Sequence, residues 1–218
     1  ERRLSSKTLE AYARAKRVCL YAGWHSQHAP AVPPAAALLA DAGSIARLDI
    51  AWREDVRKWH PGQDWIFEPQ GFGVFDPGIN ALSIASAILP MPLFVESARF
   101  EVPENRQAPI AAQITFAGGR HTADFDFRHS DGEEWTIRIE TSSGRQVELR
   151  DGGARLIVDG TEKALGPRDE YPAIYARFAE LMRARQVEVD REPLRIVADA
   201  FLAAERICVA PFMWTDES

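Results

Sequence analysis

The chain has 218 residues, of which 46% are hydrophobic and 27% charged, which is enough apolar material for one large domain or a domain with an appendage. Its net charge of −6 argues against nucleic acid as a partner, and no apolar run is long enough to predict a membrane span. Cys19 and Cys208 lie in apolar stretches, so we expect buried free thiols and, by default, a cytoplasmic location.

The first third of the chain predicts alternating helices and strands. Residues 5–17 have the apolar spacing of an amphipathic helix, and residues 18–23 form an apolar run typical of a buried strand. A proline pair at 33–34 opens a short helix that should end at Gly43. Leu48, Ile50 and Trp52 then alternate with charged residues, which predicts a strand with one buried face and places Trp52 in the core. This strand should deliver Glu54 to the loop that follows.

Residues 59–82 form a non-periodic stretch rich in Trp, Gly and polar side chains, the kind of loop in which binding chemistry is found. Asp76 followed by Pro77 predicts a helix start with Asp76 as the N-cap. Asn80 comes four residues later, so both side chains should project from one side of the first turn. A carboxylate and an amide in this arrangement can reach one small polar ligand, such as a sugar hydroxyl.

From residue 92 to 165 the apolar period changes to two, with Gly-containing turns between the runs. This predicts about six consecutive antiparallel strands, an ordinary size for a sheet. Two amphipathic helices should follow, at residues 171–185 and 193–206. The predicted fold is therefore α+β, with an open, two-layer, mainly antiparallel sheet covered by helices on one face.

Three segments together resemble a known family. They are residues 24–30 (WHSQHAP), residues 54–60 (EDVRKWH), and the Asp-Pro-Gly-Ile-Asn core at 76–80 within residues 65–82. The chain resembles the C-terminal part of aldose 1-dehydrogenases of the D-galactose and L-arabinose type, in the Gfo/Idh/MocA superfamily. Most of that superfamily carries Asp-x-x-x-His where this chain has Asp76 and Asn80.

The resemblance implies an enzyme that uses NAD or NADP to oxidise an aldose at C1 to the lactone. It implies that Asp76 and Asn80 are catalytic and address the anomeric hydroxyl. It also implies a homo-oligomer formed through the open sheet face, and the exposed half of the strands is expected to be aromatic enough to permit this. Residues 1–29 would be the end of a Rossmann-type domain, and residues 30–218 the substrate-binding and oligomerisation domain. The glycine-rich phosphate turn of such a domain does not occur in this sequence, so we expect the cofactor to be bound mainly by preceding residues.

One position departs from the family. Arg2 falls where the family has a lysine that is central to the chemistry, and an arginine keeps the charge but does not readily release a proton. This departure favours an alternative, a non-catalytic sugar-sensing or regulatory relative. A dehydratase or trans-dihydrodiol type of reaction shares the architecture and is a weaker third reading. Hexose or pentose, and NAD or NADP, stay open.

Several other side chains are candidates for sugar binding. Indole rings stack on the apolar faces of sugars, and Trp59, Trp65 and Trp135 lie in the loop or at a strand start. The acidic Glu54 resembles the family residue that binds a hydroxyl. His25 and His28 are expected to donate hydrogen bonds to the sugar rather than to bind a metal, because their spacing lacks a third ligand. His60 is interpreted as a loop residue only.

Overall fold

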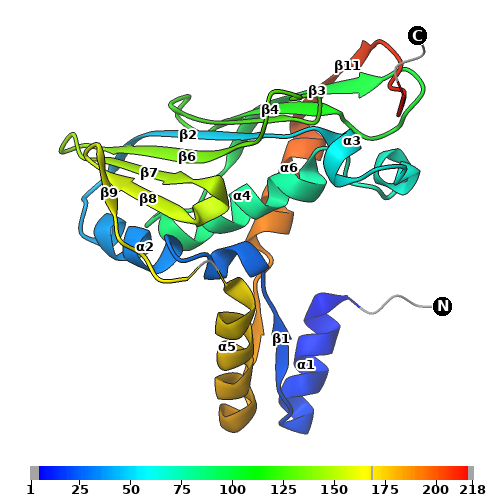
Figure 1. Cartoon of the computed structure of the whole chain (residues 1–218). Helices are drawn as coiled ribbons and strands as arrows, with labels where there is room; N and C mark the ends of the chain where they lie inside the picture. The colour runs from blue at the N-terminus through cyan, green and yellow to red at the C-terminus, as the bar shows by residue number, and fades with distance from the viewer. Residues whose placement is uncertain (1–4, 168, 216–218) are drawn as a thin grey trace.

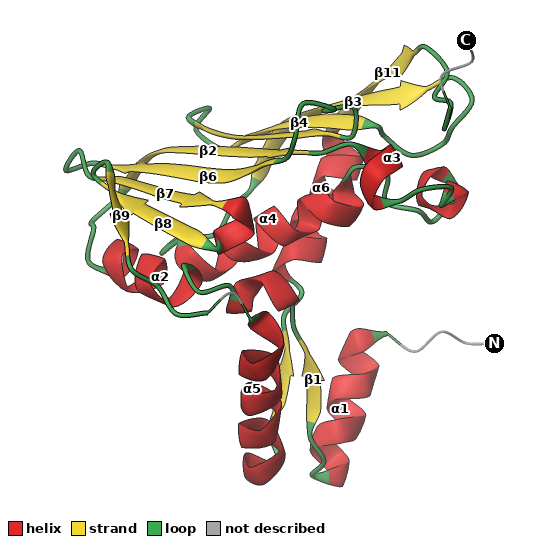
Figure 2. Cartoon of the chain, viewed as in Figure 1, coloured by secondary structure: helices red, strands yellow, loops and turns green. Residues whose placement is uncertain are grey.

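The computed structural model describes residues 5–167 and 169–215, and it has a broad body from which a narrow stalk projects (Figure 1). The body is a sheet with helices packed against one face (Figure 2). This is the predicted two-layer α+β architecture. The stalk contains α1 (Ser6–Lys16), β1 (Leu20–Ala22), α5 (Glu170–Ala184) and β10 (Val187–Val189).

Within the described residues the body sheet has nine strands, in the order β11-β3-β4-β5-β2-β6-β7-β8-β9. Its strands are β2 (Ile45–Arg53), β3 (Val95–Pro103), β4 (Ala111–Phe116), β5 (His121–Asp126), β6 (Glu134–Thr141), β7 (Gln146–Arg150), β8 (Arg155–Val158), β9 (Thr161–Lys163) and β11 (Ala204–Val209). Neighbouring pairs are antiparallel except β2 with β5 and β11 with β3. The prediction of about six strands between residues 92 and 165 was one too low, since seven form there, β3 to β9, and β2 and β11 join the sheet from distant parts of the chain.

The helices α2 (Val32–Ala40), α4 (Phe75–Ile88) and α6 (Glu192–Ala203) cover one face of the sheet. Aromatic side chains fill this interface: Phe75 of α4 packs against Phe100 and Phe125, with ring centroids 5.2 and 5.6 Å apart. The second tail helix was predicted to reach residue 206, but it ends at Ala203 and β11 follows. Short connections complete the body: α3 (Val56–Trp59) and the 3₁₀ turns η1 (His25–His28), η2 (Asp64–Phe67) and η3 (Asp151–Gly153).

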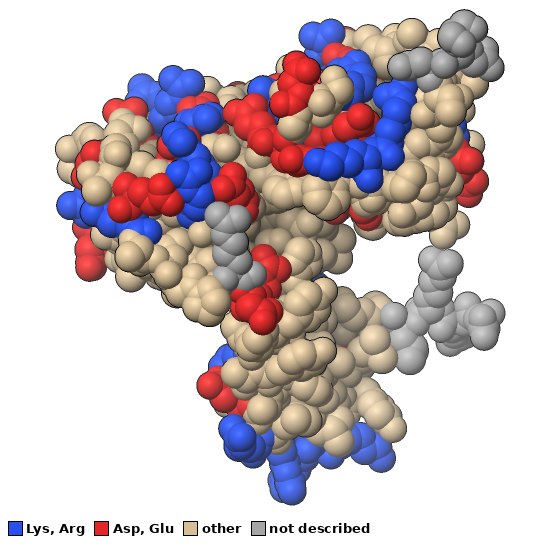
Figure 3. Space-filling view, in the orientation of Figure 1, with Lys and Arg blue, Asp and Glu red and all other residues tan. Residues whose placement is uncertain are grey.

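The opposite face of the sheet is charged, with acidic and basic side chains interspersed (Figure 3). Arg53 pairs with Asp124 at 3.1 Å, and Arg138 with Glu148 at 2.9 Å. The sequence suggested an exposed face rich in aromatic residues, and this was wrong. The strand phenylalanines point to the helices and are buried, namely Phe100, Phe116 and Phe125.

The first turn of α4 begins two residues earlier than predicted. The N-cap is Val74, and the backbone N–H of Asp76 already donates to the carbonyl of Gly73 at 2.9 Å. Asp76 is therefore not the N-cap, and its carboxylate is free to point elsewhere. Gly73 makes the early start possible because its φ is +54° and a Cβ there would lie 2.2 Å from the carbonyl oxygen of Pro109.

The stalk brings the N-terminal residues 5–22 together with residues 170–189. Ser5 caps α1 by accepting a hydrogen bond from the N–H of Thr8, and β1 pairs with β10 in parallel, with Tyr21 opposite Glu188. The predicted buried strand at residues 18–23 is shorter and only half-buried, because a two-stranded sheet has too little surface to enclose it. Cys19 is half-buried and Cys208 exposed, so the expectation of buried thiols was wrong. In the described part of the chain, no helix has the length and apolar character needed to cross a membrane.

Candidate active site

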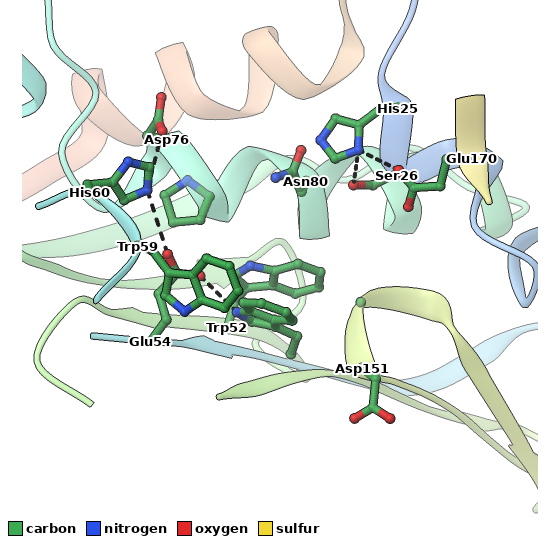
Figure 4. A pocket seen from close by; sticks show the side chains of 13 residues that line it. His25, Ser26, Trp52, Glu54, Trp59, His60, Asp76, Asn80, Asp151 and Glu170 are labelled. Atoms are coloured by element: carbon green, nitrogen blue, oxygen red, sulfur yellow. Dashed lines mark hydrogen bonds and ion pairs between the residues drawn. The ribbon is translucent and has the colours of Figure 1, made fainter. Parts of the chain in front are cut away.

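A cavity of about 380 Å³ lies between the helices, the sheet and the top of the stalk (Figure 4). Its walls come from seven parts of the chain that the fold brings together. The residues around it are His25, Ser26, Trp52, Glu54, Trp59, His60, Asp76, Pro77, Asn80, Trp135, Asp151, Gly152 and Glu170.

One wall of the cavity carries two carboxylates with a histidine between them. Glu54 follows the end of β2, Asp76 belongs to the first turn of α4, and His60 follows α3. The Nε2 atom of His60 lies 3.8 Å from Oε1 of Glu54 and 3.8 Å from Oδ2 of Asp76. The backbone N–H of His60 donates to the carbonyl of Val56 at 2.8 Å, and its imidazole ring packs against the ring of Phe127 with centroids 5.8 Å apart.

The two carboxylates differ in environment. Glu54 is 3% exposed, and burial raises its pKa to about 7, although a hydrogen bond of 2.8 Å from Nε1 of Trp135 works in the opposite direction. The nearby Asp76 adds to the rise. Burial also raises the pKa of Asp76, and His60 partly offsets this effect. Both groups are thus better proton acceptors than free carboxylates, as a general base near neutral pH requires.

Three indole rings form an apolar floor beside the carboxylates. The rings of Trp52 and Trp135 stack at 5.9 Å, and Trp59 tilts against Trp135 at 5.3 Å. Trp59 is 44% exposed and its Nε1 donates to Glu133 at 3.0 Å. Gly152 lies over this floor with φ of +67°, where even a Cβ would touch Trp52. An apolar floor edged by carboxylates suits a ligand with one apolar face and several hydroxyl groups.

The other end of the cavity is polar. His25 of η1 lies with its Nδ1 2.5 Å from Oε2 of Glu170, the first residue of α5. Glu170 is the main reason that the pKa of His25 is raised, with the Asn80 side chain contributing further; burial works against them. Asn80 lies between this pair and Asp76, one helical turn from the carboxylate (Figure 4).

The structure brings most of the predicted residues to this one cavity. His25, Glu54 and Asp76 line it together with Asn80, Trp59 and Trp135. His28 does not, because its Nε2 faces the hydroxyl of Tyr21 at 3.0 Å within the stalk. Trp65 is 51% exposed in η2 and lies outside the lining. Arg2 falls outside the described residues.

Sequence reasoning missed seven of the lining residues, and three of them bear most on the site. His60 was interpreted as a loop residue, and the structure corrects this, since it lies between the two carboxylates. Trp52 was assigned to the core alone; it is 5% exposed, and its ring edge also forms the cavity floor. Glu170 gave no signal, because it is 145 residues from its partner His25.

The cavity lining and the described ranges lack two usual features of a dinucleotide phosphate site. The cavity lining contains no Lys or Arg that could meet a phosphate. No glycine-rich phosphate turn connects a strand to a helix in the described ranges. The same ranges hold no cluster of three or more His, Cys, Asp or Glu side chains suited to a metal ion.

Comparison with known proteins finds similarity to galactose 1-dehydrogenases. No family model matches it. It is 47% identical over 188 residues to a galactose 1-dehydrogenase of Pseudomonas fluorescens, covering 85% of this chain and 61% of the relative. A crystal structure of a D-galactose-1-dehydrogenase protein from Rhizobium etli superposes with a TM-score of 0.88 at 50% identity, over 94% of this chain and 66% of that one. The chain is a homologue of galactose 1-dehydrogenases.

More distant structures share the fold alone. KijD10, a 3-ketoreductase from Actinomadura kijaniata crystallised with NADP, superposes with a TM-score of 0.67 at 17% identity, over 93% of this chain and 66% of that one. The fold of the galactose dehydrogenase homologue described here is thus that of the Gfo/Idh/MocA dehydrogenases. The chain spans slightly less than two thirds of the length of its two galactose dehydrogenase relatives.

Proposed function

We propose that this chain is the sugar-binding part of an NAD(P)-dependent aldose 1-dehydrogenase. The enzyme oxidises an aldose of the D-galactose or L-arabinose class at C1 and releases the lactone. The observation that carries the proposal is the placement of Asp76 and Asn80 on one helical turn, facing a cavity with an indole floor and a second carboxylate. Identity of 47–50% to galactose 1-dehydrogenases supports the same reaction class.

The residues of the cavity suit the steps that this reaction needs. The apolar face of the sugar would rest on Trp59 and Trp135, with the anomeric carbon toward α4. Asp76 would accept the proton of the anomeric hydroxyl while hydride leaves C1, so the C1–O bond becomes the lactone carbonyl. Asn80 would hold the same oxygen without titrating, and Glu54 would bind another ring hydroxyl. His60, which lies between the two carboxylates, would reduce the electrostatic repulsion between them.

The cofactor supplies one chemistry when bound, which is acceptance of the hydride from C1. From the family resemblance we propose that NAD or NADP is held mainly by a Rossmann-type domain. Residues 1–29 would be the end of that domain and residues 30–218 the substrate domain. Arg2, at the position of the family lysine, is the residue of this chain that the family resemblance proposes for cofactor binding.

The direct test is sugar-dependent reduction of NAD and of NADP by the intact protein, followed at 340 nm. We expect D-galactose and L-arabinose to be oxidised. D-glucose differs from galactose at C4 and should be a weaker substrate, because a hydroxyl placed against an unsuited polar group loses a hydrogen bond. Saturable galactose binding without reduction of either cofactor would contradict the proposal and establish the sugar-sensing alternative.

A further inference from the structure

Residues 212–214, called here the 212–214 segment, pack onto a part of the chain that carries two cavity residues. After β11 the backbone leaves the edge of the sheet and lies against α3 and η2 (Figure 1). The side chain of Asn105 holds Phe212 through two hydrogen bonds. It accepts from the backbone N–H of Phe212 at 2.9 Å and donates to the carbonyl of the same residue at 3.0 Å. The ring of Phe212 is buried, so the segment is anchored on both its backbone and its side chain.

Arg57 connects the 212–214 segment to α3. Its Nη2 donates to the carbonyl of Met213 at 2.8 Å, and its Nε donates to the carbonyl of Trp214 at 3.2 Å. The guanidinium group also lies over the ring of Phe212, 4.8 Å from the centroid. Because α3 has only four residues, its position depends on tertiary contacts of this kind. Trp59 is the last residue of α3 and is therefore restrained together with Arg57.

A row of aromatic rings leads from the same segment to the cavity. The centroid of the Phe212 ring lies 5.1 Å from that of Phe67 in η2. Phe127 continues the row, with its centroid 6.0 Å from that of Phe67 and 5.8 Å from that of His60. Phe67 and Phe127 are fully buried, and a close-packed interior passes a displacement of one ring on to the next.

The start of η2 is held from the same side. The Nε1 atom of Trp214 donates to Oδ1 of Asp64 at 2.8 Å, and Arg106 donates to the same oxygen at 2.6 Å. Neither Phe212 nor Trp214 belongs to the cavity lining. Any effect of these two residues on the cavity must therefore pass through α3 and η2.

We propose that Phe212 and Arg57 are positioning residues that hold Trp59 and His60 at the cavity wall. The proposed catalytic pair stands on α4, which packs against the sheet through its own aromatic contacts. Loss of the contact between Phe212 and Arg57 should thus displace the wall that meets the sugar and leave the catalytic pair in place. The step to sugar binding rests on the proposed function. The restraint of α3 does not.

The first measurement needs no sugar. Phe212→Leu keeps an apolar side chain and removes the ring contacts. Hydrogen–deuterium exchange of the intact protein reports on the amides of Trp59 and His60, which donate to carbonyls of residues 55 and 56 at 3.2 and 2.8 Å. We expect exchange in residues 56–60 to become about fivefold faster in Phe212→Leu. Unchanged exchange there overturns the proposal.

Phe116→Leu is the matched control for this measurement. Phe116 is equally buried and is the last residue of β4, whereas Phe127 bonds to Ile110, just before the first residue of that strand. We expect Phe116→Leu to lose stability in urea unfolding much as Phe212→Leu does, but to leave exchange in residues 56–60 unchanged. Equal acceleration in both variants would mean general loosening and would overturn the proposal.

Arg57→Met breaks the same connection from the side of α3, at a half-buried residue that the fold should tolerate better. It should accelerate exchange in residues 56–60 to a similar extent. In the double variant with Phe212→Leu the two effects should not add, because both changes remove one connection. Full additivity would show that Arg57 and Phe212 act independently and would contradict their common role.

The second measurement is the KM and kcat for galactose. We expect Phe212→Leu and Arg57→Met to raise KM about tenfold, as for one weakened hydrogen bond, with kcat changed by less than about twofold. Phe116→Leu should leave both constants unchanged. A fall in kcat at unchanged KM would contradict the positioning role. Faster exchange in residues 56–60 of a protein that oxidises no sugar would instead contradict the proposed function and leave the restraint of α3 standing.

Discussion

Asp76 is the side chain on which the proposed chemistry depends most directly. It lies in the first turn of α4 but does not cap the helix, so its carboxylate has little structural work to do there. Burial raises its pKa, which suits a proton acceptor. The sequence correctly placed it on the same helix face as Asn80, since residues four positions apart on a helix share a face.

We predict that Asp76→Asn lowers kcat by about 10²–10⁴-fold, the usual contribution of a general base. Stability should change by no more than about 1 kcal/mol, the size of a carboxylate effect near a helix N-terminus. Steady-state kinetics and urea unfolding of the intact protein measure the two effects. Asp41→Asn, at the exposed end of α2, is the matched control and should alter neither. Normal turnover in Asp76→Asn would remove Asp76 from the chemistry.

Glu54 should leave a trace in the pH dependence of stability. Its pKa is raised from 4.5 to about 7, so in the folded protein it keeps a proton that the unfolded chain has already released. Its contribution to stability is therefore complete below pH 4.5 and is lost as pH rises to about 7 and beyond. The loss is at most about 3 kcal/mol, because one pKa unit corresponds to about 1.4 kcal/mol.

The matched variant is Glu54→Gln, which keeps an acceptor for Trp135 and cannot titrate. We expect the wild type to lose stability relative to Glu54→Gln between pH 5 and pH 8, as measured by urea unfolding at both values. Parallel behaviour of the two proteins would show that Glu54 ionises in the folded state at its ordinary pKa.

At the scale of elements, α4 depends on a backbone contact that forms before the helix starts. Gly73 has φ of +54°, and a Cβ there would lie 2.2 Å from a carbonyl oxygen. We predict that Gly73→Ala costs more than about 3 kcal/mol, because backbone must move. Gly62→Ala shares the left-handed conformation, with φ of +69°, but has nothing within 4 Å, so it should cost about 1 kcal/mol. Urea unfolding compares them, and equal losses would mean that conformation alone matters at Gly73.

Local periodicity was enough to predict most helices and the alternation of most strands, because both patterns depend on residues that are close together in the sequence. The alternation that buries Ile50 and Trp52 is an example. Sequence reasoning failed where the position of a strand or side chain depends on a partner far away in the sequence. Nothing local indicates that β2 lies between β5 and β6, or that β11 extends the sheet. Glu170 could not be identified as the partner of His25 because the two are far apart in the sequence. His60 was missed because its two carboxylate neighbours come from separate elements.

At the scale of the whole molecule, the open sheet face bears on self-association. We propose that a second copy packs against it, as the family resemblance implies. Because ion pairs cover this face, such an interface would be polar and sensitive to salt. The interface expected on this face is therefore made of charged side chains and not of the aromatic contacts that the sequence suggested.

We predict that Arg138→Glu weakens self-association of the intact protein at least about tenfold, because like charges would face each other across the interface. Rising salt should weaken the wild type in the same direction. Sedimentation equilibrium measures both. Arg14→Glu is the control, since Arg14 is on the stalk and its side chain is 64% exposed. An association that resists both changes must use another surface.

The path of the chain between stalk and body makes the shape of the cavity depend on how these two parts are placed. The backbone crosses from one to the other three times: after β1 into η1, before α5, and from β10 into α6. His25 stands just beyond the first crossing and Glu170 at the second. A rotation of the stalk would separate this pair and change the cavity wall that both residues line. The geometry of that wall thus depends on how the stalk packs against the body.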